Sequence, residues 1–486
     1  MKSAERGWWC KIVVTMIRVM RPLRARLLLF LLVTSTLAIG RGGAPAFAIG
    51  EDIVDVRVLG NSRTTEDTIR SLAGVRIGDT LEEDTLASVR ERLNTAGLFS
   101  DVNVWWEAYR RGVRVNIAVK DKFPWAPVPT GSWASNNRSI GLLFVHGNLF
   151  GRGKQMVVGG RWASLDSGGL IAYRDPSLFG TWIYWEMKAI IQRQVIPEYN
   201  VNTALALNPW RESTFDSYGI EPAIGVAWFR RVRTQVSWRR DHVSYLADKL
   251  VLRDPATGIP QLPPDPEAAT SRGGVMGIGR AAISFDWRAR EFAIMMGTAL
   301  SGSVDLGGAA FGGDFDFWRA SVSWEHGVRV FRRHNFVYSV GGTIGRNIPI
   351  WWDPTAGGPG LRGYLAQQFR GDTSFGGHVE YHFPLVSLGA LDIHGLGFFD
   401  SSLIWNRNLP GDLTPDGMYL IRTSYDQRTF DPRYVEQKLD WGRDFHNAVG
   451  AGLRFFLRSV AVPLVGFDAG YGLEAKAFRY FLIVGA

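Results

Sequence analysis

Apolar and polar side chains alternate one by one along much of the chain after residue 130. Segment 232–239 (VRTQVSWR) has its valines, threonine and tryptophan at even positions and its charged or hydrophilic side chains at odd positions, and 317–325 (FWRASVSWE) repeats the pattern. Because successive side chains of a β-strand point to opposite faces, a period of two indicates strands with one apolar and one polar face. The region lacks a run of 18 apolar residues, and the mean hydropathy of the chain is -0.04. A bundle of membrane-spanning helices is therefore excluded.

Such strands suit either a transmembrane β-barrel or a soluble β-sandwich, since alternation does not say whether the apolar face meets lipid or a second sheet. The chain has 19 Trp, and many lie in or near the alternating runs, as expected for aromatic girdles at two membrane interfaces. We predict an outer-membrane barrel over residues 130–486. At about 22 residues for each strand with its share of turns, this length gives roughly 16 antiparallel strands.

The N-terminal 48 residues have the features of a secretory signal peptide. They hold eight Lys and Arg against one acid, followed by the apolar stretch 27–40 (LLLFLLVTSTLAIG) and the small-residue site 46–48 (AFA). A membrane anchor is the alternative, but the apolar stretch is shorter than the roughly 20 residues that a spanning helix needs. The basic region is long, so we expect Met20 or Met16 to be the true initiator. Most of the net charge of +9, and the one cysteine, Cys10, would leave with this segment.

Residues 49–122 predict a small α+β domain. Alternation indicates strands at 52–59, 99–106 and 112–119, and apolar residues spaced by three and four indicate helices after Thr64 and from about Glu82 to Ala96. Thr64 and Asp67 resemble a capping box, and Gly97 supplies a helix stop. The order βααββ suffices for a three-stranded sheet covered by two helices. The proline-rich segment 123–129 then predicts a hinge between this domain and the barrel.

The βααββ order, with Leu59-Gly60-Asn61 at its first turn and Gly97-Leu98-Phe99 before its second strand, resembles a POTRA domain. The resemblance implies a periplasmic module that binds extended client chains by adding a strand to an exposed sheet edge. We place this client-binding edge at the strand that contains Val102 and Val104. A structural spacer that binds nothing is the alternative.

The barrel region resembles the BamA/TamA bacterial surface antigen family. Five motifs in order carry the resemblance: 147–153 (GNLFGRG), 173–180 (YRDPSLFG), 361–364 (LRGY), 380–385 (EYHFPL) and 397–400 (GFFD). The resemblance implies that Leu361, Arg362, Gly363 and Tyr364 lie at the tip of an extracellular loop that folds back into the lumen. It also implies that Arg362 meets the carboxylate of Asp400. One departure is that a single POTRA-like unit fits before residue 125, where the family's assembly factors have several in tandem.

Physical chemistry gives a reason for this pair. A guanidinium in a partly desolvated lumen needs a carboxylate, which it can bind with two parallel hydrogen bonds. Phe398 and Asp400 share a strand face, so both can point inward while Phe399 points to lipid. Gly363 allows a tight turn, and Tyr364 can pack on the inner wall.

The resemblance implies an assembly or translocation factor of the bacterial outer membrane, with the POTRA domain in the periplasm. Its expected partners are outer-membrane lipid, unfolded outer-membrane or secreted client proteins, and periplasmic proteins or lipoproteins. A structural surface antigen, or a passive pore plugged by the lumen loop, is the alternative. We expect no enzyme, no catalytic residues, no cofactor and no metal, because the eight His show no ligand spacing and no GxSxG motif occurs. With the net charge near the N-terminus, we expect no nucleic-acid partner either.

Overall fold

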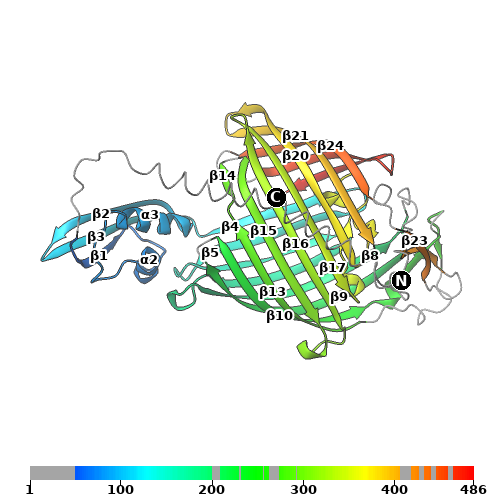
Figure 1. Ribbon diagram of the computed structural model, residues 1–486, viewed down its shortest axis with the longest axis horizontal. Coiled ribbons are helices and arrows are strands. Elements are labelled where there is room, and N and C mark those ends of the chain that lie inside the picture. Colours follow the sequence, from blue (N-terminus) through cyan, green and yellow to red (C-terminus); the bar gives the residue numbers. More distant parts are fainter. Residues whose placement is uncertain are drawn as a thin grey trace, which may run out of the picture.

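The computed structural model describes residues 50–199, 208–228, 231–254, 257–261, 273–291, 293–405, 418–425, 432–438, 445–457 and 463–485. The predicted signal peptide lies outside these residues. A small N-terminal domain precedes a closed β-barrel, and in the side view the two lie end to end (Figure 1). Within the described residues, no helix is long and apolar enough to cross a bilayer.

The N-terminal domain follows the predicted βααββ order. Its elements are β1 (Ile53–Leu59), α2 (Glu66–Ala73), α3 (Thr85–Thr95), β2 (Phe99–Tyr109) and β3 (Gly112–Asp121). The sheet order is β1-β3-β2, with β1 parallel and β2 antiparallel to β3, so β2 is an edge strand. The N-cap of α2 is Thr65, whose side chain accepts a hydrogen bond from the Thr68 amide. The predicted capping role of Thr64 is therefore corrected, since this side chain is buried against Asp121 instead.

One hydrophobic core holds this domain together. The apolar stripes of both helices, including Ile69 and Leu93, pack against one face of the sheet, including Val104 and Ile117. Each of these four side chains is almost completely buried. Burying a side chain of this size contributes about 1.5–3 kcal/mol, and so the helices are held chiefly by packing.

The barrel has 16 antiparallel strands. They are β4 (Trp125–Trp133), β5 (Arg138–Leu149), β6 (Lys154–Ala163), β7 (Asp166–Asp175), β8 (Ile183–Glu198), β9 (Arg211–Trp228), β10 (Val232–Tyr245), β13 (Gly274–Asp286), β15 (Ile294–Gly307), β16 (Phe317–Val330), β17 (His334–Arg346), β20 (Thr373–Leu388), β21 (Leu391–Trp405), β24 (His446–Leu457), β25 (Pro463–Gly472) and β26 (Ala477–Val484). Consecutive strands in this series pair with each other, and β26 pairs with β4 to close the barrel.

Short elements lie in the connections. Strands β11 (Val251–Arg253), β12 (Pro260–Gln261) and β14 (Ala289–Glu291) extend the barrel sheet, whereas β18 (Thr355–Ala356) pairs with β19 (Phe369–Arg370) and β22 (Met418–Tyr425) pairs with β23 (Pro432–Lys438). Single 3-10 turns occur at Leu178–Gly180, Ala247–Lys249, Ala309–Phe311, Ile350–Trp352 and Gly358–Gly360.

The two faces of the barrel wall differ as the alternation predicts. On β10 and β16, Val236 and Val322 point outward and are 61% and 55% exposed. The alternate residue Arg319 points inward and forms an ion pair with Asp305 of β15 at 2.7 Å. An apolar outer surface of this extent is stable in lipid and not in water, so the barrel rather than the sandwich is the observed fold.

The hinge is shorter than predicted. Strand β4 begins at Trp125 and includes Pro127 and Pro129, so that three residues, 122–124, connect it to β3. Both prolines pair in register with β5, opposite Phe144 and Leu142. Proline clusters usually mark a linker, but an edge strand can also hold proline because it needs no N–H on its unpaired side.

Candidate functional site

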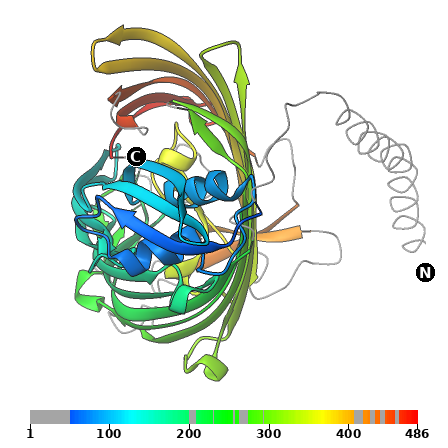
Figure 2. The same ribbon diagram turned by 90° about the vertical axis from the view of Figure 1, so that its left-hand side faces the viewer.

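The connection between β17 and β20, residues 347–372, folds back into the barrel lumen. Viewed along the barrel from the N-terminal domain, this yellow segment lies inside the ring of strands (Figure 2). Leu361, Arg362 and Tyr364 are 0%, 4% and 1% exposed. The structure thus places the LRGY motif in the lumen, enclosed by the wall.

Arg362 is the centre of a buried ion cluster. Its Nε and Nη2 donate to the two carboxylate oxygens of Asp400 on β21 at 2.8 and 2.6 Å. Its Nη1 lies 2.7 Å from a carboxylate oxygen of Glu380 on β20 and 3.3 Å from one of Asp468 on β25. The backbone amide of Arg362 also donates to Asp400 at 2.9 Å. One side chain therefore joins the loop to three strands.

The strand alternation of β21 positions the partners of this arginine. Phe398 and Asp400 face the lumen and are 6% and 1% exposed, whereas Phe399 faces outward and is 43% exposed. The guanidinium carbon of Arg362 lies 3.4 Å from the centre of the Phe398 ring, in reach of a cation–π interaction. A second arginine, Arg454, pairs with Asp468 at 2.5 Å and partly offsets the negative charge around Arg362.

Gly363 and Tyr364 fit the loop against the next strands. Gly363 has φ of +121°, and a Cβ there would lie 2.5 Å from the backbone nitrogen of Gly472, so only glycine is accommodated. The Tyr364 hydroxyl donates to the carbonyl of Asn447 at 3.1 Å and contacts the carboxylate of Glu474. Leu361 and Tyr364 also pack with Phe369, Ala448 and Ala475.

The sequence indicated Asp400 as a partner of Arg362 but did not indicate the other acids that contact the loop. Asp468 and Glu474 lie more than 100 residues from Arg362, and their positions opposite the loop depend on strand register. Glu380 belongs to the motif 380–385 but received no role. The signal that was available is a lone acid among glycines and apolar residues, as in 466–470 (GFDAG), because an unpaired carboxylate is rarely buried.

The seam between the first and last barrel strands is short. Three residue pairs join β4 and β26 in the described part of the chain, from Gly131 opposite Val484 to Trp133 opposite Leu482. By contrast, β8 and β9 share 16 pairs and β4 and β5 share nine. The strands are also staggered, so the described backbone pairing across the seam does not include residues 125–128 of β4 or 477–481 of β26.

The prolines of β4 lie on its seam side. The carbonyl of Pro124 accepts a hydrogen bond from Gly147 at the β5 side, and backbone polar groups of a strand alternate in direction. The backbone N–H and C=O positions of odd-numbered β4 residues therefore point to the seam. In agreement, a Cβ added to Gly485 would lie 2.1 Å from the carbonyl oxygen of Pro129. Pro127 and Pro129 thus offer acceptors but no donors along this edge.

Val102 and Val104 lie on β2, the edge strand of the N-terminal domain. Both side chains point into the core and are 8% and 3% exposed. The client-binding role of this edge stays a prediction, and the side chains of Val102 and Val104 are core residues of the domain. The part of β2 open to a partner is its backbone edge together with outward side chains such as Trp105, which is 37% exposed.

The N-terminal domain is fastened to the β5–β6 turn. The Thr65 amide donates to the carbonyl of Gly151 at 2.9 Å, and Asn148 donates from Nδ2 to the hydroxyl of Thr64 at 2.8 Å. That hydroxyl in turn donates to Asp121 at 2.5 Å. Burial opposes ionisation of Asp121, but the hydrogen bonds from Thr64 and from the amides of residues 62–64 outweigh it and lower the pKa of this carboxyl.

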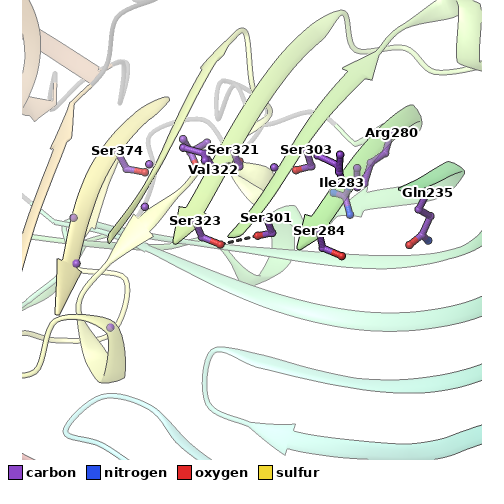
Figure 3. A pocket seen from close by; sticks show the side chains of 18 of the residues that line it. Gln235, Arg280, Ile283, Ser284, Ser301, Ser303, Ser321, Val322, Ser323 and Ser374 are labelled. Carbon is purple, nitrogen blue, oxygen red and sulfur yellow. Dashed lines mark hydrogen bonds between the residues drawn. The ribbon is translucent and has the colours of Figure 1, made fainter. Parts of the chain in front are cut away.

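The rest of the lumen wall is polar and lined by small side chains. A cavity of about 710 Å³ is bounded by serines, glycines and a few ionic side chains of β7 to β21. Ser301 and Ser323 lie opposite each other on β15 and β16, and their hydroxyl oxygens are 2.7 Å apart (Figure 3). Within the described residues, no group of His, Cys, Asp and Glu is arranged to hold a metal ion.

Comparisons with known proteins agree with this architecture. The Omp85 superfamily domain matches residues 148–456, and the POTRA model, described as a surface antigen variable number repeat, matches residues 52–122. Over 59 residues the chain is 36% identical to the outer membrane protein assembly factor BamA of Neorickettsia risticii (strain Illinois). This match covers 12% of the chain and 8% of that relative's length.

Solved structures share the fold at low sequence identity. BamA from Haemophilus ducreyi lacking POTRA domains 1–3 has a TM-score of 0.60 at 12% identity, over 89% of this chain and 84% of that one. CdiB from Escherichia coli has a TM-score of 0.53 at 11% identity, over 92% and 93%. CdiB from Acinetobacter baumannii has a TM-score of 0.55 at 13% identity, over 90% and 74%.

The Omp85 model spans more than half of the chain, and barrels of this family lie in the bacterial outer membrane. The protein therefore belongs to the Omp85 superfamily, and its POTRA domain and 16-stranded barrel are consistent with the BamA/TamA family.

Proposed function

We propose that the protein inserts client proteins into the outer membrane, or passes them across it, by pairing a client strand with the open edges of its own seam. The observation that carries the proposal is the three-pair junction of β4 and β26. Unpaired strand edges are templates for another strand. Separation of so few pairs exposes such a template within the membrane, where a client strand can satisfy its own backbone groups.

The POTRA domain would make the first contact with the client. Its edge strand β2 has 11 residues and pairs on one side with β3. An extended client segment can add to the other side through backbone hydrogen bonds, with Trp105 and its neighbours supplying apolar contacts. In this proposal the domain lies in the periplasm, the outer-membrane lipid surrounds the barrel, and periplasmic or lipoprotein partners deliver clients.

Such a function requires no hydrolytic step. Moving apolar side chains of a client strand from water into lipid is favourable by about 25 cal/mol for each Å² of apolar surface. The protein would lower the barrier by providing hydrogen-bond partners for the client backbone during this transfer. The proposal therefore assigns no catalytic residue and no cofactor.

The test is to lock the seam. Ser132 of β4 and Ile483 of β26 lie directly opposite each other, at a spacing suited to a disulfide after Ser132→Cys and Ile483→Cys. In liposomes, the reduced protein should accelerate folding of an added unfolded barrel client, and the oxidised protein should not. The control is Ser301→Cys with Ser323→Cys, which joins β15 to β16 away from the seam and should leave the acceleration intact under oxidation.

A passive pore is the second candidate, and the polar lumen cavity of about 710 Å³ is the observation that favours it. In this case the loop that bears Arg362 acts as a plug. Ion conductance across planar bilayers, together with no effect of the reduced protein on client folding, would support the pore and contradict the insertase.

A further inference from the structure

Two turns flank the seam at the barrel end that lies away from the POTRA domain. Residues 134–137 connect β4 to β5, and residues 473–476 connect β25 to β26. Each turn therefore belongs to one of the two strands that meet at the seam. The first turn contacts Ala366 of the lumen loop, and the second turn contacts Tyr364, two residues earlier in the same loop.

On the β4 side, the contact is made by Asn136. Its Oδ1 accepts from the amide of Ala366 at 2.8 Å, and its Nδ2 donates to the carbonyl of Ala366 at 3.0 Å. This amide thereby binds the loop backbone as a paired strand residue would. Its Nδ2 also donates to the hydroxyl of Tyr199 at 3.1 Å, and Tyr199 packs against Leu365.

On the β26 side, the contact is made by Tyr364. Its hydroxyl reaches the carboxylate of Glu474, which lies in the turn that leads into β26. Glu474 also accepts from the backbone amide and the side-chain amide of Asn447 at 2.9 and 3.0 Å. Tyr364 packs with Ala475 and, more loosely, Ala477 at the start of β26.

We propose that the segment Tyr364-Leu365-Ala366 is a clasp that holds the seam closed. The seam opens when the hydrogen bonds between Asn136 and Ala366 break. The clasp spans the first and last strands within three residues, beside a junction of three backbone pairs. This inference deepens the proposed function, because an insertase must open the seam. The clasp itself is a property of the barrel without a client.

The strengths of the two attachments decide which one releases. Towards β26, the loop is anchored by Tyr364 and by Arg362, whose buried pairing with Asp400 and Asp468 is costly to break. Towards β4, the attachment consists of neutral hydrogen bonds of Asn136, which are individually weaker than charge-assisted ones. Opening should therefore free the β4–β5 hairpin, while the loop stays on β20 to β25.

The test measures seam closure without any client. In the full-length protein with Ser132→Cys and Ile483→Cys, reconstituted in phospholipid liposomes, the rate of disulfide formation under a mild oxidant reports how often the seam is closed. Reaction of these thiols with a bulky maleimide reports opening. Adding Asn136→Ala should raise the fraction labelled by the maleimide about tenfold, the effect of losing about 1.4 kcal/mol.

Asn137→Ala is the matched control, because this neighbouring amide lies in the same turn and its Oδ1 has no hydrogen-bond partner. It should leave labelling unchanged. Equal labelling in the Asn136 and Asn137 variants would overturn the clasp, whatever the client-folding assay gives. If Asn136→Ala does not fold, Asn136→Asp serves instead, since it keeps the acceptor for the Ala366 amide and loses the donor. It should give a smaller rise in labelling, and no rise would overturn the proposal.

Discussion

Because Arg362 is buried, the stability of its ion pairs depends on all of its carboxylate partners being present together. The guanidinium is almost inaccessible to water and is surrounded by Asp400, Glu380 and Asp468. Removing a charge from water costs several kcal/mol, which is offset here only while every partner is in place. The motif implied the pair with Asp400, but the other two acids depend on which strands border β21, and a sequence does not state that order.

Arg362→Ala should destabilise the barrel by about 3–5 kcal/mol, because it leaves three buried carboxylates without their common partner. Arg362→Lys should fall between this variant and the parent, since an ammonium cannot bind Asp400 with two parallel hydrogen bonds. The measurement is urea titration of the folded fraction, read from heat-modifiable gel mobility.

Arg193 provides the comparison for this experiment. It also pairs with a carboxylate through two nitrogens, Asp216 at 2.6 Å, but both side chains are more than a third exposed. Arg193→Ala should cost less than about 1 kcal/mol. Equal losses in the Arg193 and Arg362 variants would contradict the importance given to burial.

Asp121 predicts a pH dependence of POTRA docking. Its pKa is lowered in the folded protein, so its contribution is complete above the unfolded carboxyl pKa of about 3.9 and is lost as the pH falls through the lower folded value. Hydrogen-exchange protection factors at residues 62–65 of the domain and 148–153 of the β5–β6 turn should therefore fall in acid more than those at other positions. Asp121→Asn should weaken docking at neutral pH and remove this acid-dependent part, and an unchanged pH profile would argue against the assignment.

At the scale of elements, the sequence predicts faces better than edges. The alternation of residues 99–106 correctly gave the buried face of β2, with Val102 and Val104 inside. Whether β2 is central or at the edge depends on sheet order, which a period of two does not contain. The same lack of information about neighbouring strands explains why the hinge was predicted too long. Pro127 and Pro129 are compatible with a strand where the backbone on one side has no partner in the sheet.

The number of barrel strands could be estimated from the sequence, but the stagger of the strands at the seam could not. The estimate of about 16 strands agrees with the barrel, since length and period determine it. The stagger of β4 against β26 could not be estimated in this way, because it depends on where two strands more than 300 residues apart meet. For the same reason, Asn136 received no role from sequence reasoning although it contacts the loop backbone twice.

At the scale of the whole molecule, the barrel has an apolar outer surface and a polar interior. Leu142 of β5 points outward and is 56% exposed, whereas Gln235 of β10 lines the lumen cavity. Leu142→Arg should cost about 2–4 kcal/mol in lipid vesicles, as expected for a cation near the bilayer midplane. Gln235→Arg introduces the same side chain on the polar face and should cost much less. Urea titrations of both variants check this, and similar losses would contradict the assigned membrane face.

The two prolines of β4 also affect how open barrels meet one another. Along residues 127–129, the seam edge presents carbonyl groups while both seam-facing nitrogens lack hydrogens. Two copies of this segment placed side by side have no N–H groups to exchange at these two positions, so pairing between them lacks the hydrogen bonds of a sheet there. An arriving client strand has donors of its own and is not subject to this restriction. If the proposed function holds, these prolines would disfavour pairing between two copies of the edge and still leave carbonyl groups that accept the N–H groups of a client strand.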